Sequence, residues 1–444
     1  MKNQNMSVIS IVKQLNEKIP YEFKKPFSGL IRRQLINHPV FIETLKTLEK
    51  ADSMTAEEIE TLQLKRLKSV LIRAATHSPY YHDLFRRIRF EPEFFKTFSD
   101  LELIPVLTKT ELKKHYNEIL TDDIHDSYEV STGGSTGVPL TIQMEKDAIY
   151  REWAFIYHYW ANYGYDYHTS KLATLRGVDI GNQKYVINPL YNEIRLNIFM
   201  LNEISFMNYI KAIDEFEADF LYGYPSAVFT FCRLANSLNV NIKGRFKGIF
   251  LISENLYSFQ EKLIEDTTNS PIAIFYGHTE RCVFAERYNG VYRFNPLYGV
   301  IEFSDEGFPI VTGFINRKTL LIRYVLDDLV EPAGDGVYRI TGHRESDIIY
   351  GKNGEEFRAS LLDFHGVLSK NLSDFQIMQQ EPGKITILYT DDISDDFKNM
   401  FVDNSKRKFG ESIDISFNLV ENIQKTKRGK YKILIQKYNM KIES

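Results

Sequence analysis

Cysteine is nearly absent from this chain, which has 2 cysteines, Cys232 and Cys282, among 444 residues. Two isolated cysteines exclude a disulfide framework and any CxxC zinc or redox site. No apolar run approaches the ~18 residues that a membrane-spanning helix needs. The segment 1–20 also lacks the apolar core of a signal peptide. The sequence therefore predicts a cytoplasmic protein without a membrane span.

A strong charge of one sign is also absent. Lys and Arg number 55 and Asp and Glu number 59, a formal net charge of −4. Because nucleic-acid binders present a basic face, this balance argues against a nucleic-acid partner. Aromatic residues, in contrast, are abundant, with 31 Phe, 27 Tyr and 2 Trp. We interpret most of them as core residues, and aromatic walls around a flat ligand are the alternative.

The first hundred residues read as a mainly helical arm. Thr55 and Glu58 have the spacing of a capping box, and apolar residues recur behind them at helical spacing over 59–74. Pro79 is expected to end that helix.

From about residue 170, short apolar runs alternate with helix-length segments, which favours an α/β fold with largely parallel sheets. The segment 290–342 reads as hairpin-linked strands, a small β subdomain, and a small α+β unit follows. The prediction is thus a large N-terminal domain, 1–345, with its helical arm, 1–100, and a C-terminal domain, 346–444.

The strongest local signal is the sequence STGGSTGVPL at 131–140. Its glycines let a ligand approach the backbone closely, and its hydroxyls and N–H groups suit an anion. It is not a Walker A loop, because the terminal Gly-Lys-Ser/Thr is missing. The strand-like runs on both sides favour an ordered binding loop over a plain surface turn.

This loop resembles the phosphate loop of the adenylate-forming superfamily, in the phenylacetate–CoA ligase-like branch that includes capsule polysaccharide biosynthesis (CapK-like) proteins. The resemblance covers nearly the whole chain and implies a large adenylation domain with a mobile α+β lid domain. The ATP-binding residues it implies in the loop are Ser131, Thr132, Gly133, Gly134, Ser135, Thr136 and Gly137.

The sequence YGHTE at 276–280 is similar to the family's Tyr-Gly-x-Thr-Glu motif. The resemblance implies that Tyr276 and Gly277 lie at adenine, that Thr279 contacts the α-phosphate region, and that Glu280 holds Mg²⁺. An aromatic face suits a flat base, and oxygen ligands suit a hard cation. Ser253 and Glu254 resemble the preceding adenine-side segment.

Two further motifs concern the ribose and the hinge. The sequence RYVLDD at 323–328 aligns Asp328 with the carboxylate that accepts hydrogen bonds from both ribose hydroxyls. The family's hinge motif places Arg344 near the ribose and the pivot at Ser346 or Asp347. Asp327 stands where relatives usually carry Gly, and Ser346 where many carry an acidic residue.

Lys430 matches the lysine of the family's Gly-Lys signature, which bridges the substrate carboxylate and the α-phosphate during adenylation. A point cation suits the negative charge that develops there. Arg176 is interpreted either as a partner for an acidic substrate or phosphate, or as half of a structural ion pair. Candidate walls of the acyl pocket, which could equally be core residues, are Tyr222, Tyr224, Pro225, Phe275 and His278.

The resemblance implies an ATP-dependent acid–thiol ligase that uses ATP, Mg²⁺ and, as acyl acceptor, coenzyme A. The acceptor could instead be an amine or hydroxyl in surface-polysaccharide biosynthesis, or AMP itself could pass to a cofactor. A catalytically idle assembly partner is a lesser alternative. The partners expected are a small carboxylic acid, ATP and a second copy of the chain, in contact through the N-terminal helices.

Overall fold

The protein is described by a computed structural model over residues 25–131, 140–178, 180–343, 348–358, 362, 368, 372, 374–425 and 431–438. In its helical arm, the capping box of Thr55 and Glu58 is present, and Pro79 begins a new helix two residues after the preceding one ends. The arm contains α3 (Ser28–Ile36), α4 (Pro39–Ala51), α5 (Ala56–His77) and α6 (Pro79–Ile88), and two short helices follow it, α7 (Lys109–Lys114) and α8 (Tyr116–Ile119). Short 3-10 helices lie at Lys25–Phe27, Pro92–Phe94, Phe98–Leu103, Pro189–Tyr191 and Ile198–Met200.

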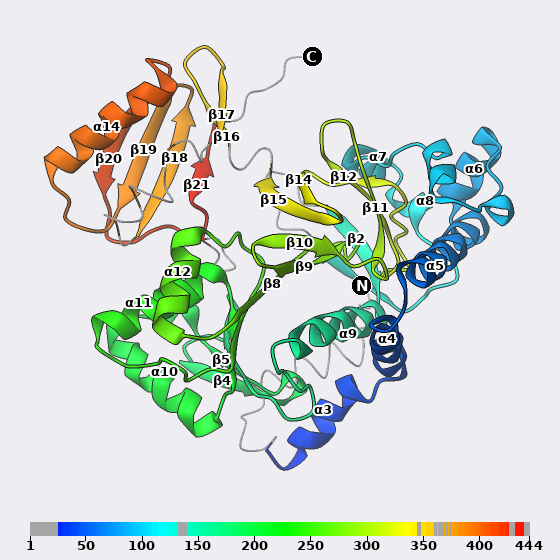
Figure 1. Ribbon diagram of the computed structural model, residues 1–444, viewed down its shortest axis with the longest axis horizontal. Helices are drawn as coiled ribbons and strands as arrows, with labels where there is room; N and C mark the ends of the chain where they lie inside the picture. The colour runs from blue at the N-terminus through cyan, green and yellow to red at the C-terminus, as the bar shows by residue number, and fades with distance from the viewer. Residues whose placement is uncertain are drawn as a thin grey trace, which may run out of the picture.

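A mixed sheet of ten strands forms the centre of the molecule (Figure 1). In spatial order its strands are β14 (Asp328–Gly334), β15 (Val337–His343), β10 (Val291–Phe294), β9 (Phe284–Tyr288), β8 (Ile272–Gly277), β7 (Gly248–Leu251), β6 (Phe220–Gly223), β3 (Leu172–Leu175), β5 (Glu193–Leu196) and β4 (Tyr185–Asn188). The strands from β8 to β5 are parallel, and those on both flanks pair antiparallel. The predicted α/β class is confirmed.

Helices cover both faces of the parallel strands (Figure 1). On one side lie α10 (Glu203–Phe216), α11 (Pro225–Ser237) and α12 (Ser258–Thr268). On the other lies α9 (Ala148–Ala161), against which α4 packs. Because both faces are covered, the four parallel strands β3, β6, β7 and β8 read as nearly continuous apolar runs.

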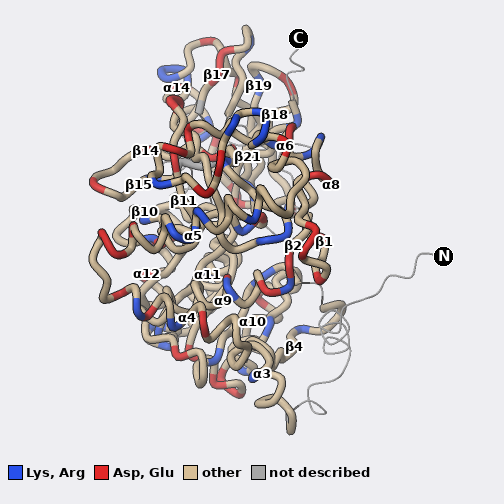
Figure 2. The backbone as a smooth tube through the Cα atoms, turned by 90° about the vertical axis from the view of Figure 1, so that its right-hand side faces the viewer, with Lys and Arg blue, Asp and Glu red and all other residues tan. Residues whose placement is uncertain are grey.

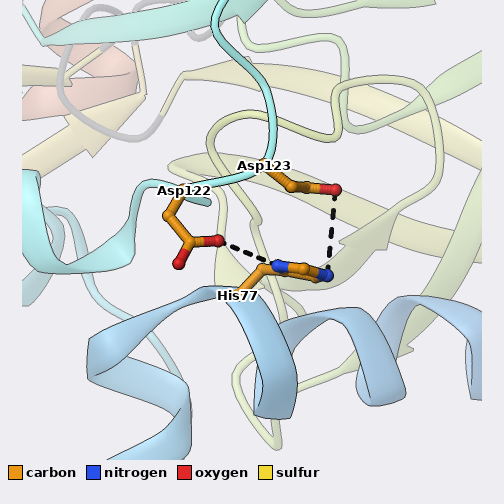
Figure 3. A group of neighbouring side chains, drawn as sticks. All are labelled: His77, Asp122 and Asp123. Carbon is orange, nitrogen blue, oxygen red and sulfur yellow. Dashed lines mark hydrogen bonds and ion pairs between the residues drawn. The ribbon is translucent and has the colours of Figure 1, made fainter.

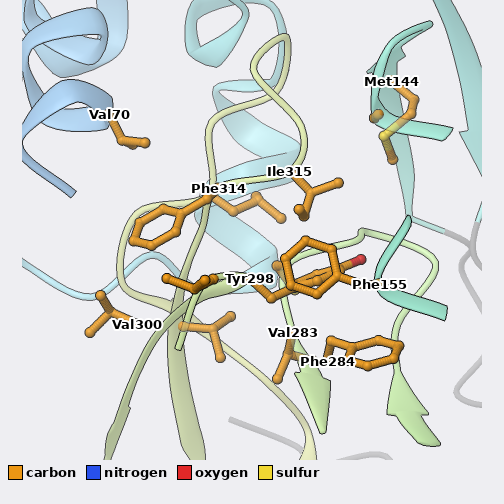
Figure 4. Packing of buried hydrophobic residues seen from close by; sticks show 14 of the residues in the cluster. Val70, Met144, Phe155, Val283, Phe284, Tyr298, Val300, Phe314 and Ile315 are labelled. Carbon is orange, nitrogen blue, oxygen red and sulfur yellow. The ribbon is translucent and has the colours of Figure 1, made fainter. Parts of the chain in front are cut away.

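Aromatic residues fill the core between α9 and the sheet. Trp160 stacks on Phe250 with ring centroids 4.2 Å apart. Phe155 and Phe284 both pack against Tyr298, and the surrounding apolar side chains close around them (Figure 4). The interpretation of the aromatic residues as core is confirmed for this layer.

Smaller sheets complete the fold. A hairpin joins β1 (Ser127–Ser131) to β2 (Thr141–Glu145), and three antiparallel strands form β11 (Gly299–Phe303), β12 (Pro309–Gly313) and β13 (Tyr324–Val325). The C-terminal part holds the hairpin of β16 (Ile348–Tyr350) and β17 (Glu356–Arg358). Its four-stranded sheet, with α14 (Asp395–Phe409), has the order β20 (Asp414–Leu419), β19 (Lys384–Tyr389), β18 (Phe375–Glu381), β21 (Leu434–Gln436).

A buried ion pair stabilises strand β5. Glu193 is 4% exposed and accepts hydrogen bonds from Arg195 Nε at 2.7 Å and Thr174 Oγ1 at 2.7 Å. Burial by itself raises the pKa of Glu193, but the charge of Arg195 and these hydrogen bonds outweigh it and lower the pKa below its ordinary value. The stability from this group is therefore complete above the unfolded pKa, about 4.3, and is lost as pH falls through the lower folded pKa.

We expect Glu193→Gln to lower the free energy of unfolding by about 3 kcal/mol at pH 7, because it leaves Arg195 buried without its counter-charge. Urea unfolding from pH 7 to pH 3 should show the difference from wild type narrowing once pH falls below about 4.3. The control is Glu217→Gln, whose ion pair with Lys171 is exposed and should change stability far less, because exposed ion pairs contribute little. A pH-independent difference would contradict the assignment.

Candidate active site

The carboxyl ends of β3, β6, β7 and β8 meet at one edge of the central sheet. Arg176 follows β3, Tyr224 follows β6, Ser253 lies two residues after β7, and His278 follows β8. In open α/β sheets, ligands bind at this edge. The motifs that the sequence analysis identified at widely separated positions are therefore brought to a common edge.

Three of the predicted residues form one hydrogen-bonded group. The Tyr276 hydroxyl donates to Asp328 Oδ2 at 2.6 Å, and His278 Nε2 lies 2.7 Å from the same oxygen. Asp328, the first residue of β14, is 4% exposed. His278, predicted as a wall of the acyl pocket, thus contacts the residue predicted to bind ribose. A buried carboxylate held by two donors is fixed in orientation, as recognition of a diol requires.

The electrostatics of this group keep its protons in place. Burial, and then the charge of Asp328, raise the pKa of the Tyr276 hydroxyl well above its ordinary value, so it remains a donor. Burial lowers the pKa of His278, but the hydrogen bond to Asp328 and the charges of Asp328 and Glu280 outweigh it, and the net pKa is raised.

Glu280 lies beside this group in a turn after β8. Its side chain is buried, with the residue 6% exposed, and its carboxylate accepts no hydrogen bond from the described residues. Among the described residues, His278 is its ion-pair neighbour, with Nδ1 of His278 3.9 Å from Oε2 of Glu280. The next residue, Arg281, anchors the turn through Glu152 and Tyr128. A buried carboxylate without a donor is costly unless a cation accompanies it, so Glu280 fits the ligand set of Mg²⁺.

The adenine-side segment after β7 contacts the C-terminal part of the chain. Ser253 has a left-handed backbone, φ 68°, which is uncommon for a residue other than glycine. Glu254 accepts hydrogen bonds from the backbone N–H of Ser226 at 3.0 Å and from that of Tyr431 at 2.8 Å. A second link is the ion pair of Arg233 with Asp374 at 2.6 Å. Glu254, predicted at adenine, thus also joins the large sheet to the C-terminal part.

The sequence predicted to be a phosphate loop lies between two paired strands, β1 and β2. Ser131 ends β1, is exposed, and lies opposite Thr141 of β2. Several predicted residues lie outside the described residues: Thr132, Gly133, Gly134, Ser135, Thr136, Gly137, Arg344, Ser346, Asp347 and Lys430. Of the YGHTE motif, Gly277 and Thr279 are described and exposed.

Most of the residues predicted to line the acyl pocket lie in the hydrophobic core. Tyr222 and Phe275 belong to the aromatic core beside α9, where Phe275 stacks on Phe284. Tyr224 belongs to the core beneath α10 and α11, and Pro225 is the buried first residue of α11. The Tyr222 hydroxyl nevertheless reaches Arg176 at the sheet edge.

A separate cluster of His77, Asp122 and Asp123 lies at the end of α5 (Figure 3). His77 Nδ1 is 2.8 Å from Asp122 Oδ1, and its other nitrogen faces Asp123. Arg73 already forms an ion pair with Asp123. Because Arg73 already neutralises Asp123, we interpret this cluster as a structural contact that joins α5 to the chain after α8.

The surface and the helices provide two further observations. Figure 2 shows Lys and Arg interleaved with Asp and Glu along the face that it draws, so neither sign is segregated there. Across the described parts of the chain, each helix is too short or too polar to cross a membrane.

Comparison with known proteins gives two results. Residues 349–437 match the CapK C-terminal domain family, and Protein CapK of Staphylococcus aureus is 22% identical over 420 residues, covering 89% of this chain and 92% of that protein. The fold is similar to crystal structures of 2-hydroxyisobutyryl-CoA ligase at 16% identity. In the postadenylation state with R3-HIB-AMP, the TM-score is 0.63 and the match covers 86% of this chain and 90% of that one. In the thioesterification state with 2-HIB-AMP and CoA, the TM-score is 0.50 and the match covers 86% and 91%.

These results confirm the resemblance that the sequence predicted. The chain has the fold of the adenylate-forming ligases, with a large N-terminal and a small C-terminal part, and its C-terminal part is of the CapK type.

Proposed function

We propose that this chain, a protein with the adenylate-forming ligase fold and a CapK-type C-terminal domain, activates a carboxylic acid as its acyl-adenylate and then transfers the acyl group to the thiol of coenzyme A. The observation that carries the proposal is the group of Tyr276, His278 and Asp328 beside the buried Glu280 at the carboxyl edge of the sheet. These residues stand at the positions where the family's motifs serve adenine, ribose and the metal.

The reaction proceeds in two half-reactions. The substrate carboxylate attacks the α-phosphorus of ATP, a new P–O bond forms, and pyrophosphate leaves. The thiol, after losing its proton, then bonds to the acyl carbon, and AMP leaves with the electron pair of the C–O bond. Activation is needed because a thiol cannot readily displace oxide or hydroxide from a free carboxylate, whereas AMP is a good leaving group.

Each residue has a role in this scheme. Tyr276 supplies an aromatic face to adenine, and Asp328 accepts hydrogen bonds from the ribose hydroxyls. The loop from Ser131 to Gly137 binds the β- and γ-phosphates, and Lys430 stabilises charge on the α-phosphate. Glu280 would hold Mg²⁺, which when bound neutralises charge on the phosphate oxygens. The C-terminal domain, 346–444, rotates about Ser346 and Asp347 between the two half-reactions. The reaction takes place in the cytoplasm.

A second candidate changes the acceptor. The C-terminal part matches the CapK family, whereas the ligase crystallised with CoA is similar in fold alone. This difference favours testing an amine or hydroxyl acceptor of surface-polysaccharide biosynthesis, or AMP transfer to a cofactor, beside coenzyme A.

Pyrophosphate release across a panel of carboxylic acids, with and without coenzyme A, tests the proposal. Release with selected acids and a thioester product, identified by mass spectrometry, would support it. Acid-dependent release that coenzyme A leaves unchanged, with an amide, ester or adenylylated product, would favour the second candidate. Absence of release with every acid would contradict adenylation.

We expect Glu280→Gln to raise the Mg²⁺ concentration for half-maximal pyrophosphate release at least about tenfold, since altering a metal site's partners commonly costs that much affinity. The amide keeps the shape of the side chain but removes the charge that a hard cation requires. The matched control is Glu331→Gln, an exposed carboxylate on β14. An unchanged magnesium requirement would exclude Glu280 as a ligand, and a large fall in melting temperature would make its role structural.

A further inference from the structure

Arg176 occupies an unusual position at the edge of the sheet. It follows β3 directly and donates from Nη1 to the Tyr222 hydroxyl at 3.0 Å, with its guanidinium carbon 5.3 Å from the centroid of the Tyr222 ring. Its Nε is buried and has no hydrogen-bond partner. The residue as a whole keeps intermediate exposure.

The ion-pair interpretation of Arg176 is not supported by the described residues, in which no carboxylate oxygen lies within 4.0 Å of its guanidinium. Other sheltered arginines differ. Arg195 pairs with Glu193 and Arg281 with Glu152, while Arg32 donates to two backbone carbonyls. Arg176 instead interacts with the hydroxyls of Tyr222 and Tyr224 and with the more distant charge of Glu193. Its guanidinium stays charged at any physiological pH, and its Nε remains an unpaired donor.

A second polar group without a partner lies on the neighbouring strand connection. Tyr224 N–H donates to Leu175 O at 3.0 Å, which holds the start of α11 beside the end of β3. Ser226, in the first turn of α11, is 6% exposed, and its hydroxyl is buried without a hydrogen-bond partner. Its backbone N–H is already bonded to Glu254. The Ser226 hydroxyl, in the first turn of α11, and Arg176 Nε, after β3, are thus two unpaired donors.

The order of the strands places Arg176 away from the nucleotide side. From β8, where Tyr276 and His278 lie, the sheet passes through β7 and β6 to β3. Three strand spacings of about 4.8 Å separate β8 from β3, roughly 14 Å. A group bound at Arg176 is therefore remote from the ribose and from the carboxylate that reacts beside it.

We propose that Arg176 is a specificity-determining residue that binds a second anionic group of the acyl substrate, so that the preferred acids carry a carboxylate or phosphate besides the reacting carboxylate. This inference rests on the proposed adenylation activity. Oxygen anions suit the site because guanidinium groups bind carboxylate and phosphate through paired, charge-assisted hydrogen bonds.

The test compares matched acids in pyrophosphate release. Suberate and sebacate are paired with octanoate and decanoate, and 8-phosphonooxyoctanoate is paired with 8-hydroxyoctanoate, because a chain of this length is needed to approach the separation of roughly 14 Å. The second member of each pair keeps the reacting carboxylate but lacks the distal anion, and it is called the neutral match. Wild type should use at least one anionic member with a kcat/KM at least about tenfold above its neutral match. The two arms distinguish a second carboxylate from a phosphate.

Variants then assign the preference to this side chain. Arg176→Gln should lower kcat/KM for the preferred acid about thirtyfold, as loss of one partner of a sheltered charge pair does, and should change the neutral match less than threefold. Arg176→Lys should restore part of the preference. Arg245→Gln, at an exposed ion pair with Asp214, serves as the matched control.

The outcomes separate the two proposals. Release with neutral acids as efficient as with their anionic matches overturns the inference and leaves adenylation standing. Equal loss on both classes of acid in Arg176→Gln also overturns it, since the residue would then be structural. No release with any acid overturns adenylation and the inference together. If Arg176→Gln does not fold, the wild-type comparison decides.

Discussion

Lys430→Ala is expected to slow acyl-adenylate formation at least about a hundredfold, because one preorganised charge at the reacting phosphate commonly contributes that much. Thioester formation from supplied acyl-adenylate should be less affected, since no negative charge develops on phosphorus in that step. The two half-reactions are measured separately, as pyrophosphate exchange and as thioester release from the synthetic adenylate.

The contacts of Tyr431, the residue that follows Lys430, support this prediction. Tyr431, next in sequence, donates its N–H to Glu254 after β7 and its hydroxyl to Phe375 O. The chain beside Lys430 is therefore fastened to the edge that carries the predicted nucleotide residues. Lys432→Ala is the control, since its side chain is exposed, and it should leave both rates within about twofold, as surface substitutions usually do. Equal losses in both half-reactions for Lys430→Ala would contradict the assignment.

The parallel core of the fold could be predicted from the sequence because burial on both faces leaves a direct signature. The four apolar runs that became β3, β6, β7 and β8 are short and bounded by Gly, Pro or charge, as fully covered strands require. Strands β4 and β5 escaped prediction. Glu193 and Arg195 lie on β5, and charged residues in a buried strand are recognisable only once their mutual ion pair is known.

The sequence could predict which residues lie at the candidate site but not which of them contact one another. Motifs at strand ends identify which residues reach the common edge, because carboxyl ends of parallel strands share it. The contact of His278 with Asp328 joins residues 50 positions apart, and it depends on side-chain directions that no local pattern encodes. The bond from Tyr431 to Glu254 depends in addition on how the C-terminal part meets the large sheet.

For Arg176, the sequence indicated a charged residue at the sheet edge but did not distinguish a ligand-binding role from a structural ion pair. An arginine directly after an apolar run indicates a charge at the sheet edge, and an ion pair is the usual interpretation of such a residue. Its partners in three dimensions are the hydroxyls of Tyr222 and Tyr224 and the more distant charge of Glu193, and its Nε is unpaired. The unpaired Nε is the observation on which the proposed ligand-binding role rests.

Asp328→Asn is expected to lower kcat/KM for ATP about a hundredfold, because two charge-assisted hydrogen bonds to the ribose hydroxyls are weakened together. The asparagine keeps the size of the side chain, so the groups that contact it, Tyr276 and His278, retain a neighbour of the same shape. The loss should appear in nucleotide use rather than in folding, which a melting curve of the variant checks.

The nucleotide itself supplies the decisive comparison for Asp328. Wild type should use ATP more efficiently than 2′-deoxy-ATP by at least about tenfold, since one bond to a charged acceptor is lost. In Asp328→Asn this ratio should fall towards one, because the protein and ligand changes remove the same interaction and are then non-additive. Asp327→Asn is the matched control: its carboxylate is more exposed and faces Lys109 at 3.5 Å, so the ratio should remain that of wild type. If Asp328→Asn kept the full preference for ATP, Asp328 would serve to hold Tyr276 and His278 in place, and the ribose would be bound elsewhere.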